Sequence, residues 1–196
     1  MVVEPIVLEG RLVRLEPLRV DHFPALAELA FDPEIWRWTR TRVTSETDLR
    51  GWMDEALEQA ALGKALPWVT MSRPSGKIIG STRYMDIDAR NRGLEIGGTW
   101  IAPAWQRSGI NVEAKYLQLR HAFETLGAIR IAFKTHHKNV KSQTAIAALG
   151  ATQEGVFRNH MITQDGSFRH SVWFSIIEEE WPAVKIELEA RMAAHG

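Results

Sequence analysis

The order of predicted strands and helices between residues 94 and 149 constrains the fold more than any other feature of this 196-residue sequence. Four consecutive segments alternate between strand and helix patterns: Leu94–Ala102, Asn111–Leu126, Ile129–Thr135 and Lys141–Leu149. Pro103 ends the first strand, and Gly127 and Gly150 close the two helices. Because parallel strands need a crossover that is usually a helix, this order predicts an α/β fold with a parallel pair of strands.

Two hairpins are predicted on either side of this central unit. Trp68–Ser72 and Lys77–Asp86 have strand composition and surround a Pro74-Ser75-Gly76 turn. Gln153–Thr163 and Ser167–Ile177 flank Asp165-Gly166, a dipeptide typical of tight hairpin turns. We therefore expect a mixed sheet that is only partly parallel, with helices on its faces.

The two ends of the chain complete a single predicted domain, residues 1–196. Arg11–Glu16 alternates like a half-buried strand, and Asp21 is expected to cap a helix over Phe23–Ala30. A longer helix is expected to open at Ser45, with Asp48 completing a capping box, and to end at Gly63. Glu178–Met192 is predicted to form a final amphipathic helix.

Composition excludes several classes of function. The chain has 24 basic and 24 acidic residues, so we expect neither nucleic acid nor an acidic membrane as a partner. It has no cysteine, which excludes disulfides, thiolate metal sites and a cysteine nucleophile. No secretory signal or bilayer-length apolar run is recognised, so a cytoplasmic location is expected. A homodimer is one assembly that the sequence allows.

The segment between the first central strand and its helix suggests a ligand. Gln106, Ser108 and Gly109 lie in a short loop that opens directly into the helix. Helix N-termini present unpaired N–H groups and a positive dipole end, and glycine allows close approach of the backbone to a ligand. This loop alone is equally consistent with a simple strand-to-helix turn.

Two motifs together resemble the GNAT superfamily of N-acetyltransferases, specifically the branch of ribosomal-protein N-acetyltransferases. Gln106–Asn111 matches the first four positions of the superfamily pattern Gln/Arg-x-x-Gly-x-Gly/Ala, and Asn111 departs at the last. Asn139–Gly150 matches Asn-x-x-Ser-x-x-x-x-x-x-Leu-Gly. The resemblance extends from Leu8 to Pro182. Asn111 is expected either to cap the helix or to crowd the ligand.

The resemblance implies an acetyl-CoA-dependent N-acetyltransferase that acts on a primary amine of a protein N-terminus or a small molecule. A catalytically silent acetyl-CoA-binding domain is the alternative. The sheet is then expected to splay between the strands Leu94–Ala102 and Ile129–Thr135. The resemblance also implies the cofactor-binding residues, which are Trp100, Ile101, Ala102, Arg107, Ser108, Gly109, Ile110, Asn111, Asn139 and Ser142. Ser142 is further implied as the proton donor to the leaving thiolate.

Two residues are candidates for the general base. Glu95 begins the strand that is expected to splay, where some members of the superfamily keep a glutamate base. His160 is the second candidate, because imidazole titrates near neutral pH and the residue lies near the expected acceptor cleft. No metal site is expected, since His136 and His137 are adjacent and should point apart on an extended chain. Trp36, Trp38 and Trp52 either wall the acceptor cleft or pack in the core.

Overall fold

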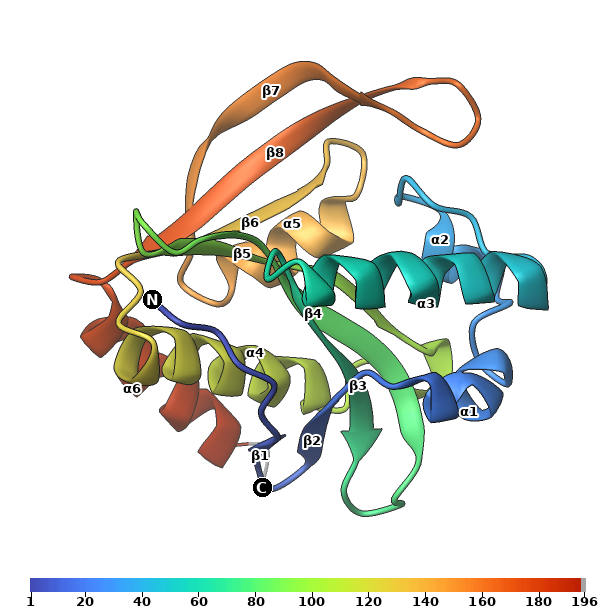
Figure 1. Ribbon diagram of the computed structural model, residues 1–196. Helices are drawn as coiled ribbons and strands as arrows, with labels where there is room; N and C mark the ends of the chain where they lie inside the picture. Colours follow the sequence, from blue (N-terminus) through green and yellow to red (C-terminus); the bar gives the residue numbers. More distant parts are fainter. Residues whose placement is uncertain (195–196) are drawn as a thin grey trace.

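The computed structural model describes residues 1–194, and the strands in that range form one eight-stranded sheet in the order β1-β2-β3-β4-β5-β6-β8-β7 (Figure 1). The strands are β1 Leu8–Glu9, β2 Val13–Pro17, β3 Leu66–Ser72, β4 Ile78–Asp88, β5 Gly93–Ile101, β6 Arg130–His136, β7 Thr152–Ile162 and β8 Phe168–Ile177. Only β5 and β6 pair in parallel, and the other neighbours are antiparallel. The predicted mixed, partly parallel sheet is confirmed.

The helices cover both faces of this sheet, as predicted. They are α1 Phe23–Ala27, α2 Pro33–Trp36, α3 Glu46–Ala61, α4 Ile110–Arg120, α5 Val140–Ala147 and α6 Trp181–Ala193. A π-helical turn, His121–Thr125, continues α4. Figure 1 shows α6 beside α4, whereas α1, α2 and α3 gather at a different part of the sheet. No helix within residues 1–194 combines the length and apolar character needed to cross a bilayer.

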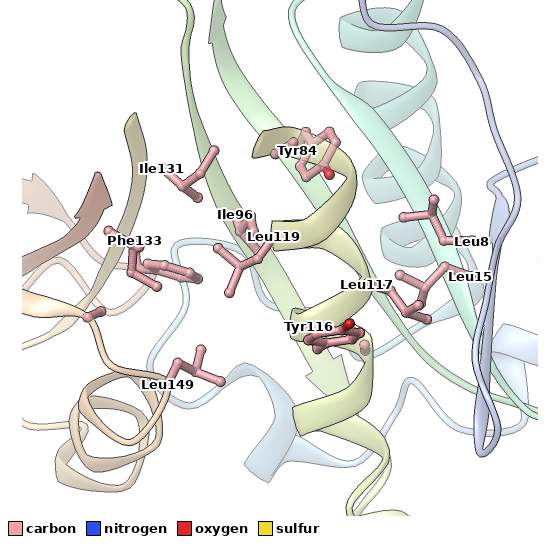
Figure 2. Close-up of a cluster of buried hydrophobic side chains, with 14 of the residues drawn as sticks. Leu8, Leu15, Tyr84, Ile96, Tyr116, Leu117, Leu119, Ile131, Phe133 and Leu149 are labelled. Atoms are coloured by element: carbon pink, nitrogen blue, oxygen red, sulfur yellow. The ribbon is translucent and has the colours of Figure 1, made fainter. Parts of the chain in front are cut away.

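Two hydrophobic clusters lie on the opposite faces, because successive strand residues point to opposite sides. Trp68 of β3 belongs to the cluster packed by α4 and α6, and its neighbour Val69 belongs to the cluster packed by α1 to α3. Figure 2 shows Leu117 of α4 near Leu8 and Leu15, while Leu119 points toward the side of Ile131 and Phe133. Helix α4 is therefore the central support of one face, buried along most of its length.

The sheet splays between β5 and β6, as predicted. The two strands pair only at Gly93↔Arg130, Leu94↔Ile131 and Glu95↔Ala132, although they continue to Ile101 and His136. Beyond Glu95 and Ala132 the two strands therefore leave a gap between their facing edges. Near this gap β5 also bulges, because two of its residues, Gly98 and Thr99, stand opposite the single Thr82 of β4.

Of three local predictions near the N-terminus, one is confirmed and two were wrong. The strand predicted at residues 11–16 is β2, which pairs with the short strand β1 in a hairpin. Asp21 does not cap α1, because its carboxylate accepts from Arg19 Nε, and His22 holds the N-cap position. Ser45 does cap α3, but Asp48 accepts from Thr44 N rather than closing a box with Ser45.

Candidate active site

The loop before α4 presents a run of free backbone N–H groups. Arg107 and Gly109 have φ values of 62° and 80°, a left-handed conformation that turns successive N–H groups toward one side. Helix α4 begins at Ile110, and its first backbone bond is Glu113 N to Gly109 O at 3.1 Å. The N–H groups of residues 107–112 find no acceptor within residues 1–194. Such a concave set of donors at a helix N-terminus suits a phosphate.

Asn111 does not cap α4, because Gly109 occupies the N-cap position. The Asn111 side chain is half-buried in the first turn, and its Oδ1 is buried with no hydrogen-bond partner in the described residues. The backbone N–H of Asn111 is still one of the free N–H groups of residues 107–112. The substitution at this position of the motif therefore leaves the donor geometry of the loop intact.

Side chains of the loop fasten it to β5 and α5. Gln106 Nε2 donates to Ile101 O at 2.9 Å, at the end of β5. Lys141 Nζ, from the first turn of α5, donates to Gln106 Oε1. Ser108 Oγ donates to Trp105 O at 2.6 Å, while the exposed Arg107 has no such bond in the described residues. Gln106 therefore links the three elements that border the gap.

Glu113 fixes the start of α4, a role that the sequence did not reveal. Its carboxylate accepts from the backbone N–H groups of Arg11, Leu12 and Val13 at 2.8, 2.6 and 2.8 Å. A side chain at Gly10 would place Cβ 2.6 Å from the Glu113 carboxyl carbon, so the carboxylate would have to move from its three acceptor positions. Glu113 thus joins the β1–β2 turn to the first turn of α4.

The start of α5 borders the other side of the gap. Asn139 caps this helix, because its Oδ1 accepts from Ser142 N at 3.1 Å. Ser142 is half-buried, and its hydroxyl has no partner in the described residues. The hydroxyl is therefore available to a ligand, whereas the Asn139 side chain already serves the helix.

The end of β5 has only part of its backbone available. Ala102 N donates to Ile79 O in β4 at 2.8 Å, and the Trp100 carbonyl lies against Gly80 of β4. Because backbone groups alternate along a strand, those of Ile101 point away from β4; its carbonyl accepts from Gln106, and its N–H faces the gap. The Trp100 indole packs with Trp36 and Trp52 at centroid distances of 5.8 and 6.1 Å.

Glu95 is a buried acid rather than a surface carboxylate. Its side chain is 3% exposed, and Lys134 Nζ of β6 donates to its Oε2 at 2.7 Å. The same ammonium donates to Asp86 Oδ2 at 3.1 Å. Burial raises the pKa of Glu95 to about 7, although Lys134 opposes the shift. Glu95 is also the last residue of β5 that pairs with β6, so it lies where these two strands separate.

His160, the second candidate base, lies on β7, and Trp173 packs between it and Lys134. Its Nδ1 is 2.9 Å from Ser171 Oγ, and Arg169 Nε donates to that oxygen at 3.0 Å. The centroid of the Trp173 ring lies 5.9 Å from the centroid of the His160 imidazole and 5.2 Å from Lys134 Nζ. Burial lowers the pKa of His160, and nearby cations lower it further. The imidazole is therefore neutral at pH 7.

The prediction that His136 and His137 point apart was wrong. Their rings stack with centroids 4.4 Å apart, because His136 ends β6 and His137 already belongs to a turn. Trp38 packs on His136 at 5.0 Å and is only half-buried. Trp36 and Trp52 lie in the core, so Trp38 is the one tryptophan of the three that borders the surface.

These residues fit a long, phosphate-bearing acyl donor. The free N–H groups of residues 107–112 suit its phosphates, and the gap between β5 and β6 offers unpaired strand edges for an extended chain with amide groups. The unpartnered hydroxyl of Ser142 is a group that can donate a proton, and the buried carboxylate of Glu95 is one that can accept it. The arrangement can thus support acyl transfer to a nucleophile.

Comparisons with known proteins agree with this geometry. The family model described as an acetyltransferase (GNAT) domain matches residues 12–152. A GCN5-related N-acetyltransferase from Brucella melitensis is 30% identical, with a TM-score of 0.91 over 98% of this chain and 87% of that chain. A proposed acetyltransferase from T. thermophilus is 38% identical, with a TM-score of 0.88 over 97% of this chain and 99% of that chain.

A more distant structure shares the fold alone. Mycobacterium smegmatis RimJ in complex with CoA-disulfide is 22% identical, with a TM-score of 0.82 over 95% of both chains. The search among curated proteins found no match. The family model covers most of the chain, and the two nearer structures align over almost all of it. This chain therefore belongs to the GNAT family of acetyltransferases.

Proposed function

We propose that this protein transfers an acetyl group from acetyl-CoA to a primary amine by direct attack of the amine on the thioester. Two observations carry the proposal: Glu95 is buried at the point where β5 and β6 part, and the start of α4, which follows β5 in the chain, has free N–H groups. The co-substrate supplies an activated acyl group. The backbone of residues 107–112 holds its phosphates, and the strand edge at Ile101 holds its extended arm.

Glu95 acts as the general base. A primary amine is mostly protonated at pH 7 and must lose a proton before it can attack. With its pKa near 7, the Glu95 carboxylate is ionised in about half of the molecules at that pH and can accept this proton, directly or through a water. Lys134 holds the carboxylate in place by its 2.7 Å bond. His160 is the alternative base.

Ser142 acts as the proton donor. During the transfer one C–N bond forms, one C–S bond breaks, and the sulfur leaves as a thiolate that must gain a proton. The Ser142 hydroxyl, which has no other partner in the described residues, gives that proton and is restored from water. Glu95 takes the proton that the ammonium loses before attack. The second proton, which the nitrogen loses as the amide forms, passes through water to restore Ser142, so the products are a neutral amide and a thiol.

The charges around His160, near the expected acceptor cleft, favour some amines over others as acceptors. Lys134, Arg169 and Arg40 all lower the pKa of His160, so three cations lie around it. A polyamine adds further positive charge and is therefore a poor acceptor. A peptide N-terminus adds a single charge, which agrees with the ribosomal-protein branch that the motifs resemble.

An acceptor screen tests the proposal. Acetyl-CoA is incubated with the protein and with peptides of different N-terminal residues, an amino sugar, an amino acid or a polyamine, and free thiol is measured. We expect release with at least one acceptor, and slow release by Glu95→Gln despite normal acetyl-CoA affinity. Saturable binding without turnover on every acceptor would instead support the catalytically silent domain.

A further inference from the structure

A buried lysine lies beneath the gap and has no acidic partner in the described residues. Lys115, in the second turn of α4, is only 5% exposed. Its Nζ donates to Thr82 Oγ1 at 2.7 Å, Thr99 Oγ1 at 2.6 Å and Gln118 Oε1 at 2.9 Å. All three ammonium hydrogens are thus used by neutral groups. Burying a charge without an opposite charge is costly, and burial accordingly lowers the pKa of Lys115 to about 7.

Thr99 connects this lysine to the gap. It belongs to the bulge of β5, past the last residue that pairs with β6, and it is exposed, whereas Thr82 is 1% exposed. Of the three groups that bind Lys115, only the Thr99 hydroxyl therefore meets both the buried ammonium and the open edge of the strand. Gln118 is fully buried.

The hydrogen bonds around Thr99 allow two arrangements, and one of them leaves its own hydrogen free. Thr82 Oγ1 lies 2.8 Å from Thr99 Oγ1, and either hydroxyl can be the donor. If Thr99 donates, the Thr82 hydrogen goes to Gln118 Oε1 at 3.3 Å, whereas the Thr99 hydrogen is free if Thr82 donates to Thr99. With Lys115 donating as well, both acceptor positions of Thr99 Oγ1 are filled, because a hydroxyl accepts at most two hydrogens. The only other acceptor for Thr99 in the described residues is Gly97 O at 3.4 Å, which is a weak bond. The O–H group can therefore point into the gap.

Resting on the proposed acetyl transfer, we propose that the Thr99 hydroxyl donates a hydrogen bond to the acyl oxygen of the bound thioester, and that Lys115 is the positioning residue that orients and polarises this hydroxyl. Negative charge grows on that oxygen as the amine attacks. A donor that already accepts from an ammonium is a stronger donor, because hydrogen bonds in a chain polarise one another. Preorganised donors of this kind stabilise the transition state more than the ground state.

The test compares two threonines that bind the same lysine. Thr99→Val and Thr82→Val each remove one hydroxyl from Lys115, but only Thr99 reaches the gap. We expect Thr99→Val to lower kcat by about 10²–10³-fold, the range for loss of one such donor. Thr82→Val should lower kcat by less than about threefold, and Thr99→Ser should restore most of the rate. Melting temperatures control for folding. An equal loss of kcat in the two valine variants would overturn the proposal.

A binding measurement needs no turnover and separates this inference from the proposed function. Calorimetry gives Kd for acetyl-CoA and for CoA, which lacks the acyl oxygen. Thr99→Val should weaken acetyl-CoA relative to CoA, and Thr82→Val should leave that ratio unchanged. An unchanged ratio in Thr99→Val would refute the contact, even if the wild-type protein acetylates amines. If no acceptor is acetylated, the same ratio still decides the contact.

The role of Lys115 is tested through a double-mutant cycle. Lys115→Met removes the charge and keeps most of the volume. If Lys115 acts through Thr99, the double variant Lys115→Met/Thr99→Val is no slower than Thr99→Val alone. Additive losses of kcat would show that Lys115 acts by another route. If Lys115→Met fails to fold, Lys115→Arg is the second variant, because it keeps the charge. It should still bind acetyl-CoA more tightly than CoA, and Thr99→Val should remove that preference. Loss of the preference in Lys115→Arg alone would count against the role of Lys115 in orienting Thr99.

Discussion

The ion pair between Lys134 and Glu95 makes the pH dependence of the enzyme adjustable. As a base, Glu95 must be ionised, so kcat/KM should rise with pH through about 7, the raised pKa of its buried carboxyl. The Lys134 ammonium lies 2.7 Å from Glu95 Oε2 and holds that pKa below the value that burial alone would produce. Because Lys134→Met removes this ammonium, the variant should move the rising limb to higher pH.

The size of this shift follows from the geometry. Two charges about 4 Å apart interact by about 4 kcal/mol at an effective dielectric constant of about 20, and one pKa unit corresponds to about 1.4 kcal/mol. That energy corresponds to about three pKa units. Asp86 shares the lysine, and neighbouring opposite charges usually shift a carboxyl by about one to three units. We expect the midpoint in Lys134→Met at about pH 8 or higher.

The assay is a pH–rate profile of kcat/KM from thiol release. Asp86 raises the pKa of Glu95, so Asp86→Asn should move the midpoint in the opposite direction, to lower pH. Lys185→Met, which breaks the pair between Lys185 of α6 and Glu124 of the π-helical turn, is the matched control and should leave the midpoint unchanged. Acceptors of different amine pKa separate the enzyme from the substrate, because only a substrate titration follows the acceptor.

Three outcomes would refute the assignment of Glu95. The midpoint could stay fixed in both Lys134→Met and Asp86→Asn, or it could follow the acceptor pKa in every variant. Alternatively, the rising limb could survive in Glu95→Gln and disappear in His160→Gln. The last result would make His160 the base, with a limb below the ordinary imidazole pKa of about 6.5 because burial lowers it.

Three further substitutions test the surrounding residues. Gly109→Val should weaken acetyl-CoA binding at least about tenfold by calorimetry, because a branched side chain at φ 80° is strained by roughly 1–2 kcal/mol and blocks close approach of a phosphate. Unchanged affinity would reject the phosphate loop. Ser142→Ala should lower kcat by about 10²–10⁴-fold with an unchanged Kd, and a wild-type kcat would reduce Ser142 to a helix-terminus residue. Glu113→Ala leaves three N–H groups without their acceptor, so it should cost about 3 kcal/mol or more in unfolding free energy and lower Tm by roughly 6–12 °C, whereas the exposed Glu187→Ala should not.

The sequence predicted the features that depend on local periodicity. The strands and helices from β3 to β8 lie within a few residues of their predicted bounds, and the splay follows from the family motifs. The charged groups of the site were harder to predict because their partners are distant in sequence. Lys134 meets Glu95 from 39 residues away, and Glu113 binds a turn about 100 residues earlier. Nothing in a local pattern distinguishes them from surface charges.

The burial of Lys115 had no clear signal in the sequence. This lysine shares one helical stripe with Asn111, Gln118 and Ala122, spaced four, three and four residues apart, and two of these neighbours are polar. Such a stripe is typical of a solvent-facing side of a helix, although in the structure Gln118 and Ala122 are fully buried. The identity of its partners also required the structure, because Thr82 and Thr99 meet only through the bulge between β4 and β5.

The bonds from Glu113 to residues 11–13 have a consequence for the folding of the chain. The turn that they fix lies near the beginning of the sequence, whereas the helix that it steadies begins at Ile110. Closing so long a loop costs conformational entropy before the contact forms, so this contact belongs among the late events of folding. Local opening of the N-terminal hairpin would loosen the start of α4. Ligand bound at residues 107–112 should therefore slow hydrogen exchange at the amides of Arg11, Leu12 and Val13, although those amides do not touch the ligand.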